Sequence, residues 1–206
     1  MKLCVMDFDS TLMDGETIDL IAETCGLGEK VSSITEAAMR GELDFFESLS
    51  QRASLLEGMD ASVVEEVCAT LPWMPGAKAL AKALKAEGYK MMVFSGGFRN
   101  ATKRAVSELG FDADFSNVLH AKEGKLSGLV GGDMMFDISK GDMLLRIQNI
   151  LGVSKENTMV IGDGANDRSM FKHAGKRVAF CAKPILKEAA NIIIDDKNLE
   201  NVIEYL

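Results

Sequence analysis

The chain opens on Leu3-Cys-Val-Met-Asp-Phe-Asp-Ser-Thr11, a short apolar run that stops at two aspartates. Consecutive apolar residues of this kind suit a strand that is buried on both faces of a parallel sheet. Asp7 and Asp9 follow at alternate positions, so in an extended chain both carboxylates project toward the same side. The stretch predicts a first strand that ends at a polar crevice. Taken alone, the pair is better interpreted as two acids that cap the following turn.

Further apolar runs of the same kind recur along the chain. They lie at residues 90–94, 158–161, 177–180 and 192–194, and the helical patterns between them lie at residues 77–87, 101–109, 141–151 and 167–173. This alternation predicts an α/β fold with a doubly wound, mostly parallel, Rossmann-like sheet. In such sheets, ligands bind beyond the carboxyl ends of the strands.

Two segments interrupt the alternation. Residues 15–71 contain no strand-like run, and their amphipathic patterns, with a capping box starting at Ser62, predict an inserted helical cap subdomain. Residues 117–132 predict a small β-hairpin, because two apolar stretches flank a Glu-Gly turn. We therefore expect an α/β catalytic core made of residues 1–14 and 72–206, and a cap made of residues 15–71.

Composition and charge limit the possible classes of function. With 47% hydrophobic residues and 3 prolines, the chain cannot be disordered or collagen-like. The net charge of −8 is unfavourable for nucleic acid or an anionic membrane, and no apolar run is long enough to span a membrane. Cys4, Cys25, Cys68 and Cys181 lack C-x-x-C spacing, which predicts buried free thiols and a reducing cytoplasm.

Three downstream motifs carry polar groups that could bind a ligand. Ser95-Gly-Gly97 offers a hydroxyl and unhindered backbone groups to an anion, although an ordinary β-to-α turn has the same pattern. Lys140 opens a later helix and by itself is typical of a solvated lysine. Gly162-Asp-Gly-Ala-Asn-Asp167 gathers three oxygen-bearing side chains on one turn, which suits Mg²⁺, with a polar helix cap as the alternative.

The combination of these motifs is far more specific than any one of them. In their order along the chain, they resemble the haloacid dehalogenase-like phosphohydrolase superfamily over nearly the whole sequence. Further details resemble members of it that act on phosphoserine: Glu16, Phe45 and Arg52 in the predicted cap, Ser95-Gly-Gly-Phe98, and Phe180-Cys-Ala-Lys-Pro184. The resemblance implies an enzyme that needs Mg²⁺ and hydrolyses O-phospho-L-serine to L-serine and phosphate through an aspartyl-phosphate, as the last step of serine biosynthesis.

The resemblance also implies a catalytic set and a metal-binding set. Asp7 would be the nucleophile, and Asp9 would protonate the leaving oxygen and later activate water. Mg²⁺ would be held by Asp7, the backbone carbonyl of Asp9, and Asp163, with Asn166 and Asp167 close by. A dianionic phosphate would be repelled by this many carboxylates unless cations offset them, so the charge balance also requires the metal.

The substrate-binding set that the resemblance implies is Glu16, Phe45, Arg52, Ser95, Gly96, Lys140 and Asn166. Ser95 and Lys140 would hold the phosphoryl oxygens. Glu16 would accept from the ammonium of the substrate, and Arg52 would form a planar fork with its carboxylate. Phe45 would close over the site and exclude water. Without the resemblance, Arg52 is better interpreted as an exposed helical residue.

Several alternatives stay open. The enzyme could act on another small phosphate, or transfer the phosphoryl group to an alcohol such as homoserine. A signalling receiver module shares some features but is shorter, with its acceptor aspartate mid-chain, and a non-enzymatic scaffold would not need an intact catalytic set. We expect phosphoserine as the small-molecule partner, a monomer or homodimer, and a cytoplasmic location. Because Asp7 lies so near the start, feedback through an amino-terminal regulatory domain is not expected.

Overall fold

The computed structural model describes residues 1–39 and 42–206. The strands are β1 (Lys2–Met6), β2 (Tyr89–Phe98), β3 (Ala113–Lys122), β4 (Lys125–Gly132), β5 (Thr158–Gly162), β6 (Lys176–Phe180) and β7 (Ile192–Ile194). The α-helices are α1 (Thr17–Glu23), α2 (Gly28–Met39), α3 (Phe45–Ser54), α4 (Ala61–Thr70), α5 (Ala77–Ala86), α6 (Arg99–Leu109), α7 (Ser139–Leu151), α8 (Arg168–Phe171) and α9 (Pro184–Lys187). Helical turns of other types are η1 (Phe8–Leu12), η2 (Lys155–Asn157), η3 (Ala165–Asp167) and η4 (Leu199–Tyr205).

The strands form one sheet in the order β4-β3-β2-β1-β5-β6-β7. Every neighbouring pair is parallel except β3 and β4, which form an antiparallel hairpin at one edge. The predicted α/β fold with a mostly parallel sheet is therefore confirmed. Each apolar run that was expected to be a strand lies within one.

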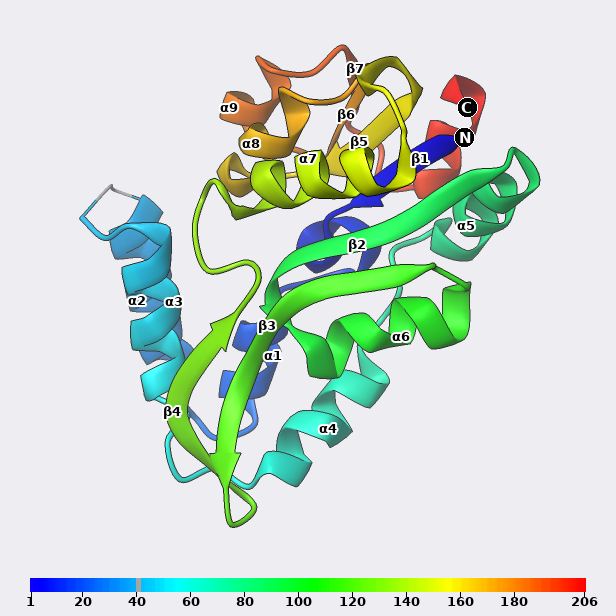
Figure 1. The fold of residues 1–206 in the computed structure, drawn as a ribbon. Helices are drawn as coiled ribbons and strands as arrows, with labels where there is room; N and C mark the ends of the chain where they lie inside the picture. Colours follow the sequence, from blue (N-terminus) through cyan, green and yellow to red (C-terminus); the bar gives the residue numbers. More distant parts are fainter. Residues whose placement is uncertain (40–41) are drawn as a thin grey trace.

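Both faces of the sheet are covered, as Figure 1 shows. Cys4 and Met6 of β1 belong to a core packed against α5, α6 and η4, whereas Leu3 and Val5 belong to a core packed against α7, α8 and α9. Alternate residues of one strand thus point into opposite layers, which is why the run contains no polar residue.

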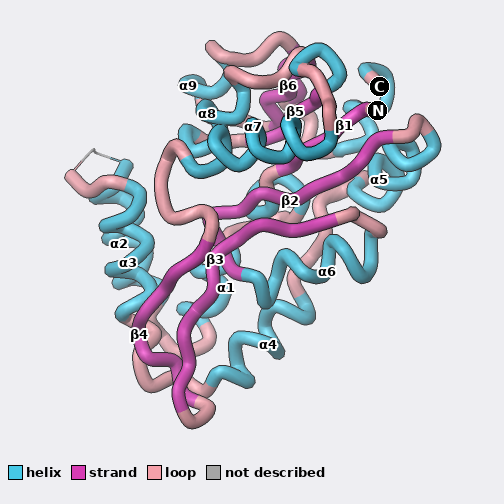
Figure 2. Tube along the Cα trace, in the orientation of Figure 1, coloured by secondary structure: helices cyan, strands magenta, loops and turns pink. Residues whose placement is uncertain are grey.

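Helices α1 to α4, which we call the cap, follow β1 and lie beside the hairpin at one end of the sheet (Figures 1 and 2). Backbone hydrogen bonds from Gly58 N to Leu126 O (2.9 Å) and from Ala61 N to Gly124 O (2.8 Å) join the cap to the hairpin. The boundaries that the sequence suggests for the cap, residues 15 and 71, stay a prediction.

The predicted hairpin is confirmed, but β3 begins earlier than the sequence pattern indicated. Its first residues, from Ala113, pair in parallel with β2 before the strand continues into the hairpin. This start was missed because Ala113-Asp-Phe115 has no apolar run. The hairpin is thereby an edge of the main sheet and not a separate element.

The expected capping box at Ser62 is wrong. The helix there begins at Ala61, after Asp60, with no side-chain cap. A capping box starts α3 instead, where Glu47 N donates to the Asp44 carboxylate (2.8 Å) and Asp44 N donates to the Glu47 carboxylate (3.0 Å). An aspartate fills the cap position as well as a serine does.

The cysteines are all free thiols. Cys4 and Cys68 are buried as expected, and burial raises the pKa of both. The expectation of burial is wrong for Cys25 and Cys181, which are exposed. No helix in the described part of the chain is both long and apolar enough to cross a membrane.

Candidate active site

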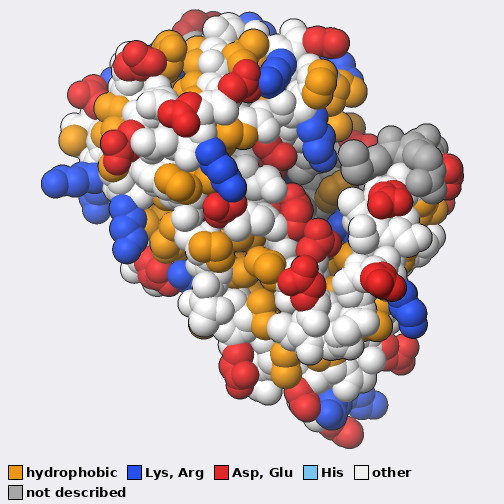
Figure 3. Space-filling model, turned by 180° about the vertical axis from the view of Figure 1, so that it is seen from behind, with side chains coloured by type: hydrophobic (Ala, Val, Ile, Leu, Met, Phe, Trp, Pro, Cys, Tyr) orange, Lys and Arg blue, Asp and Glu red, His pale blue; other side chains and the backbone are white. Residues whose placement is uncertain are grey.

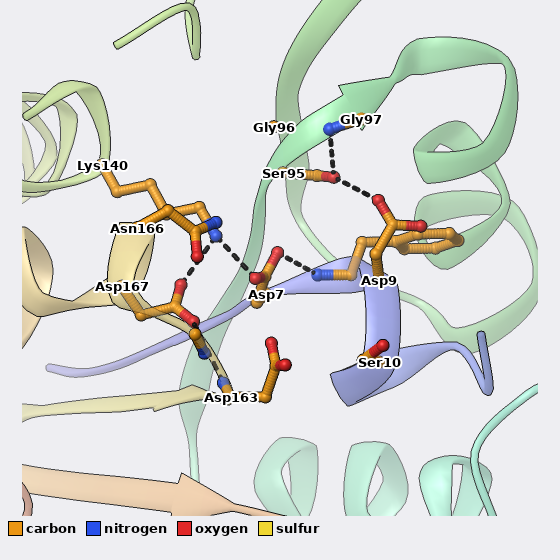
Figure 4. A network of polar contacts seen from close by, with 12 residues as sticks. Asp7, Asp9, Ser10, Ser95, Gly96, Gly97, Lys140, Asp163, Asn166 and Asp167 are labelled. Atoms are coloured by element: carbon orange, nitrogen blue, oxygen red, sulfur yellow. Dashed lines mark hydrogen bonds and ion pairs between the residues drawn. The ribbon is translucent and has the colours of Figure 1, made fainter. Parts of the chain in front are cut away.

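The site lies where three adjacent parallel strands end. Asp7 follows β1, Ser95 lies near the end of β2, and Asp163 follows β5. Because β1 pairs with both β2 and β5, their carboxyl ends meet at one edge of the sheet. Figure 4 shows the side chains from these ends pointing toward one another, with Lys140 and Asp167 beside them.

A buried chain of charges connects Asp7, Lys140 and Asp167. Lys140 Nζ lies 2.8 Å from Asp7 Oδ2 and 2.7 Å from Asp167 Oδ1, and the three residues are 4% exposed or less. Burial alone would lower the pKa of Lys140, but the charges of Asp167 and Asp7 outweigh it and raise that pKa. For Asp7, burial and the charge of Asp167 outweigh Lys140, so its pKa is well above the ordinary value.

Asp167 also holds the turn that carries Asp163. Its Oδ2 accepts from the backbone N–H groups of Asp163 (3.0 Å) and Gly164 (3.1 Å). A side chain at Gly162 would collide with the Asp167 carboxylate, so glycine is required at that position. Both oxygens of Asp167 are therefore engaged, one by the turn and one by Lys140.

Asp7, Asp163 and Asp167 form a cluster that could hold a metal ion, since each offers an oxygen within 4.8 Å of the others. Burial, followed by the charge of Asp167, raises the pKa of Asp163 to about 7. Carboxylates gathered this closely repel one another unless a cation neutralises them. A hard divalent cation that prefers oxygen ligands fits this donor set. Asp7 and Asp163 are the better candidates, because both line the cavity between core and cap, whereas Asp167 is used by the turn and by Lys140.

Asp9 is held on the other side of Asp7, in a position fixed by the cap and by β2. Its Oδ1 accepts from the backbone N–H of Thr17 (2.9 Å) and from the Thr17 hydroxyl, and its Oδ2 accepts from Ser95 Oγ (3.4 Å). Burial raises the pKa of Asp9, although the hydrogen bonds from Thr17 lower it in part. A raised pKa makes a neutral carboxylic acid available for proton donation.

The two glycines after Ser95 give the site close backbone approaches. A Cβ added at Gly96 would lie 2.6 Å from Phe45 Cζ, and one added at Gly97 would lie 2.5 Å from Asp9 Oδ2. Gly97 N donates to Ser95 Oγ (2.9 Å). Phe45, at the start of α3, thus rests directly on Gly96 and forms a wall of the site.

Glu16 and Arg52 lie at the cap end of the cavity. The Glu16 carboxylate accepts from the hydroxyl of Ser10, a residue that adopts a left-handed backbone (φ 55°) in the turn after β1. Loss of hydration at this site, followed by the charge of Asp9, raises the pKa of Glu16 to about 7, although the residue is still exposed to solvent. Arg52 Nε donates to Ser48 O (3.3 Å).

These groups line one cavity of about 570 Å³ between the core and the cap. On the face seen in Figure 3, acidic side chains gather in the hollow between the two lobes. Among the sequence-predicted residues that line it are Asp7, Asp9, Glu16, Phe45, Arg52, Gly96, Asp163 and Asn166. Ser95 and Lys140, both buried, lie just behind this surface and contact Asp9 and Asp7, respectively. The structure thus brings the whole predicted set together.

Some residues of the site were missed by sequence reasoning. Thr17, which donates twice to Asp9, has no motif of its own. Lys183 and Asp19 also line the cavity. Lys183 belongs to the quoted Phe180-to-Pro184 motif, which was the available signal. Asp19 looks like any helical aspartate, so only the fold reveals its place.

Comparison with known proteins agrees with this geometry. A family model described as haloacid dehalogenase-like hydrolase matches residues 1–175. The chain therefore belongs to the haloacid dehalogenase-like hydrolase family, which confirms the resemblance in its motifs.

Individual relatives indicate the group within the family to which the chain belongs. A phosphoserine phosphatase of Wolinella succinogenes is 61% identical over 206 residues and is covered in full, as is this chain. One of Methanocaldococcus jannaschii is 45% identical, over 100% of this chain and 97% of the relative. A solved structure described as a phospho-aspartyl intermediate analogue of phosphoserine phosphatase has a TM-score of 0.94 at 45% identity, covering 100% of this chain and 98% of its own. Within the family, the chain is a member of the phosphoserine phosphatases.

Proposed function

We propose that the protein hydrolyses O-phospho-L-serine to L-serine and phosphate, which completes serine biosynthesis. The observation that carries this proposal is that one cavity has two unlike ends. At one end, Asp7 and Asp9, contacted by Lys140 and Ser95 respectively, suit a phosphoryl group. At the other end, Glu16 and Arg52 offer opposite charges to an ammonium and a carboxylate. Phosphoserine carries these three groups. A solved substrate-bound phosphoserine phosphatase, at 45% identity and a TM-score of 0.94, supports the same substrate.

In the first chemical step, a carboxylate oxygen of Asp7 attacks the phosphorus and the bond from phosphorus to the serine oxygen breaks. Asp9, which burial keeps available in its neutral form, gives its proton to the leaving oxygen. Lys140, Ser95, the backbone at Gly96 and the amide of Asn166 are the groups proposed to hold the phosphoryl oxygens. The products of this step are serine and an aspartyl-phosphate.

In the second step, Asp9 takes a proton from water, and the water oxygen attacks the phosphorus of the aspartyl-phosphate. The bond to Asp7 breaks, phosphate leaves, and both aspartates return to their starting forms. We infer that Asp7, the Asp9 carbonyl and Asp163 would hold Mg²⁺, which would supply positive charge to stabilise the phosphoryl oxygens. The proposed core (1–14 and 72–206) and cap (15–71) meet at this cavity, and Phe45 would exclude water from it.

We also propose where in the cell the protein lies and which oligomeric state it adopts. Free thiols throughout the chain favour a reducing cytoplasm. A monomer or a homodimer is proposed, because each chain has its own complete set of site residues.

The proposal is tested by measuring phosphate release from phosphoserine, phosphoethanolamine and p-nitrophenyl phosphate, first with Mg²⁺ and then with EDTA. We expect phosphoserine to be strongly preferred and EDTA to abolish turnover. Chromatography of the products with homoserine added distinguishes hydrolysis from transfer to an alcohol. Equal rates on the first two substrates would contradict the proposed substrate, and full activity in EDTA would contradict the metal.

A further inference from the structure

The two carboxylate oxygens of Asp9 have unequal surroundings, and Thr17 is the cause. Oδ1 of Asp9 accepts from both the backbone N–H (2.9 Å) and the hydroxyl of Thr17. Thr17 is the first residue of α1 and is 1% exposed, so water does not compete for these two hydrogen bonds. A carboxylate oxygen has two lone pairs. Thr17 therefore occupies both acceptor positions of Oδ1.

Oδ2 of Asp9 is much less engaged. In the described part of the chain its one hydrogen bond comes from the Ser95 hydroxyl at 3.4 Å, which is long for a bond between two oxygens. Figure 4 shows this contact, together with the bond from Gly97 N to Ser95 Oγ. A Cβ at Gly97 would lie 2.5 Å from Oδ2, so glycine keeps the space beside this oxygen open. Asp9 and Gly97 both line the cavity.

This asymmetry matters when Asp9 is a neutral acid. A proton on Oδ1 would take a lone pair that one of the Thr17 donors uses, and that donor would be left buried without an acceptor. Such a loss is costly in a buried site. A proton on Oδ2 leaves both hydrogen bonds from Thr17 intact. The two oxygens are thus not equivalent as carriers of the proton.

The backbone N–H of Thr17 alone would not single out this role. It belongs to the first turn of α1, where N–H groups have no partner within the helix, and any acceptor at that place would satisfy it. The hydroxyl is different, because it fills the second lone pair of Oδ1. It is also the part of Thr17 that a substitution can remove.

We propose that Thr17 is a positioning residue for Asp9: by filling both acceptor positions of Oδ1, it places the acidic proton on Oδ2, the oxygen beside Gly97. In the first step the bond from phosphorus to the serine oxygen breaks, its electron pair stays on that oxygen, and the proton moves there from Oδ2. In the second step Oδ2 takes a proton from the attacking water. The inference rests on the proposed function, since it requires Asp9 to be the general acid.

The test is Thr17→Val, which removes the hydroxyl and keeps the backbone N–H and the shape. Thr24→Val is the matched control, because Thr24 ends the same helix and its hydroxyl donates to Ile21 O (2.7 Å). Rapid quenching with Mg²⁺ present measures the first step in a single turnover, as serine released from phosphoserine and p-nitrophenol released from p-nitrophenyl phosphate.

We expect Thr17→Val to slow the release of serine by about tenfold, the size expected for the loss of one hydrogen bond to the acid. The release of p-nitrophenol should be unchanged, because this leaving group needs little protonation. Thr24→Val should behave as the wild type with both substrates. Thr17→Ser, which keeps the hydroxyl, should recover most of the lost rate.

A double-mutant cycle with Asp9→Asn makes the test specific. In the Asp9→Asn background, Thr17→Val should not slow the release of serine further, because the proton that Thr17 places is gone. Thermal midpoints are measured for all variants. If that of Thr17→Val is lowered, Thr17→Ala, which also lacks the hydroxyl, repeats the test with a smaller side chain.

Several results would overturn the inference. Equal slowing with both substrates, or a loss that persists in the Asp9→Asn background, would show that Thr17 acts on something other than the proton of Asp9. If the wild type hydrolyses phosphoserine and the variants without the hydroxyl release serine as fast as it does, only this inference fails. If the wild type does not hydrolyse phosphoserine, the proposed function fails and the inference fails with it.

Discussion

Replacing Lys140 with methionine removes the only cation in the buried chain of charges that it forms with Asp7 and Asp167. Its ammonium lies 2.8 Å and 2.7 Å from the two carboxylates, and all three side chains are almost fully buried. Methionine keeps much of the length and volume of the side chain, so the change is chiefly one of charge. The variant therefore measures how far the two acids depend on this lysine.

Breaking a buried ion pair typically costs about 3–5 kcal/mol, because the partner is left charged and unpaired. We expect a loss of unfolding free energy in that range for Lys140→Met at pH 8 in EDTA. Asp7 can escape part of the cost by binding a proton. Its pKa is already well above the ordinary value, and the variant loses the lysine that lowers it, so the folded state holds the extra proton and its stability must fall as the pH rises. At pH 5 the loss should therefore be smaller.

The assay is urea unfolding followed by circular dichroism at pH 5 and pH 8. Lys187→Met is the control, because Lys187 forms an exposed ion pair with Asp195 (2.6 Å) that should contribute about 0–1 kcal/mol at most. Mg²⁺ should stabilise Lys140→Met more than it stabilises the wild type, whereas Lys187→Met, in which the acidic cluster is intact, should gain as much stability as the wild type. A loss at pH 8 no larger than that of Lys187→Met, or a loss independent of pH, would refute the electrostatic reasoning.

Other consequences can be measured in the same preparations. Asp7→Asn should lose roughly 10³-fold or more in kcat while remaining folded; activity within tenfold of the wild type would exclude it as the nucleophile. Arg52→Ala should lose about 30- to 300-fold in kcat/KM on phosphoserine. This is the lower part of the range for an enclosed carboxylate that has lost its partner, because Arg52 is only half-buried. An equal loss on p-nitrophenyl phosphate would place Arg52 at the phosphoryl group instead. The pKa of Glu16 is raised from 4.5 to about 7 in the folded protein, so its ionised form destabilises the fold at pH 8. Glu16→Gln should therefore be more stabilising at pH 8 than at pH 5 when unfolding is measured in EDTA. The opposite order would contradict the raised pKa. The rings of Phe46 on the cap and Phe136 on the core are stacked, with their centroids 5.4 Å apart. Phe136→Ala should therefore reduce the free energy that keeps the cap closed by about 0.5–1.5 kcal/mol and increase hydrogen exchange in α3. Unchanged exchange would show that the stack does not hold the cap.

The sheet and the motifs that follow its strands could be predicted because they depend on local pattern. The run before Asp7 is apolar on both faces, and this is visible in sequence. By contrast, the start of β3 at Ala113 depends on pairing with β2, which leaves no apolar run to detect. The sequence pattern assigned a capping box to Ser62, but the structure has one at Asp44. Many short segments have the spacing of a capping box, so the spacing alone does not select the right one.

The site could be predicted only as far as each residue belongs to a motif. Lys140 alone looks like a solvated lysine, and its burial between two carboxylates appears only when α7 packs beside the turn after β5. Thr17 contributes through Asp9, which lies eight residues earlier in the chain and belongs to another element. Residues that act by touching another site residue carry no signature in a single sequence, because their role is defined by the neighbour.

The distribution of charge in the site explains why a chain of net charge −8 can bind a phosphate ester. Asp7, Asp163 and Asp167 are packed closely enough that burial and mutual repulsion raise the pKa of Asp7 and of Asp163, and Lys140 cannot neutralise all of them. Repulsion built into the fold in this way favours any cation that relieves it. Once a divalent ion and Lys140 are both in place, the local charge suits an anion even though the surrounding surface is acidic. The proposed binding of a cation and the tolerance of an anionic substrate would thus have the same physical origin, namely carboxylates that the sheet brings close together.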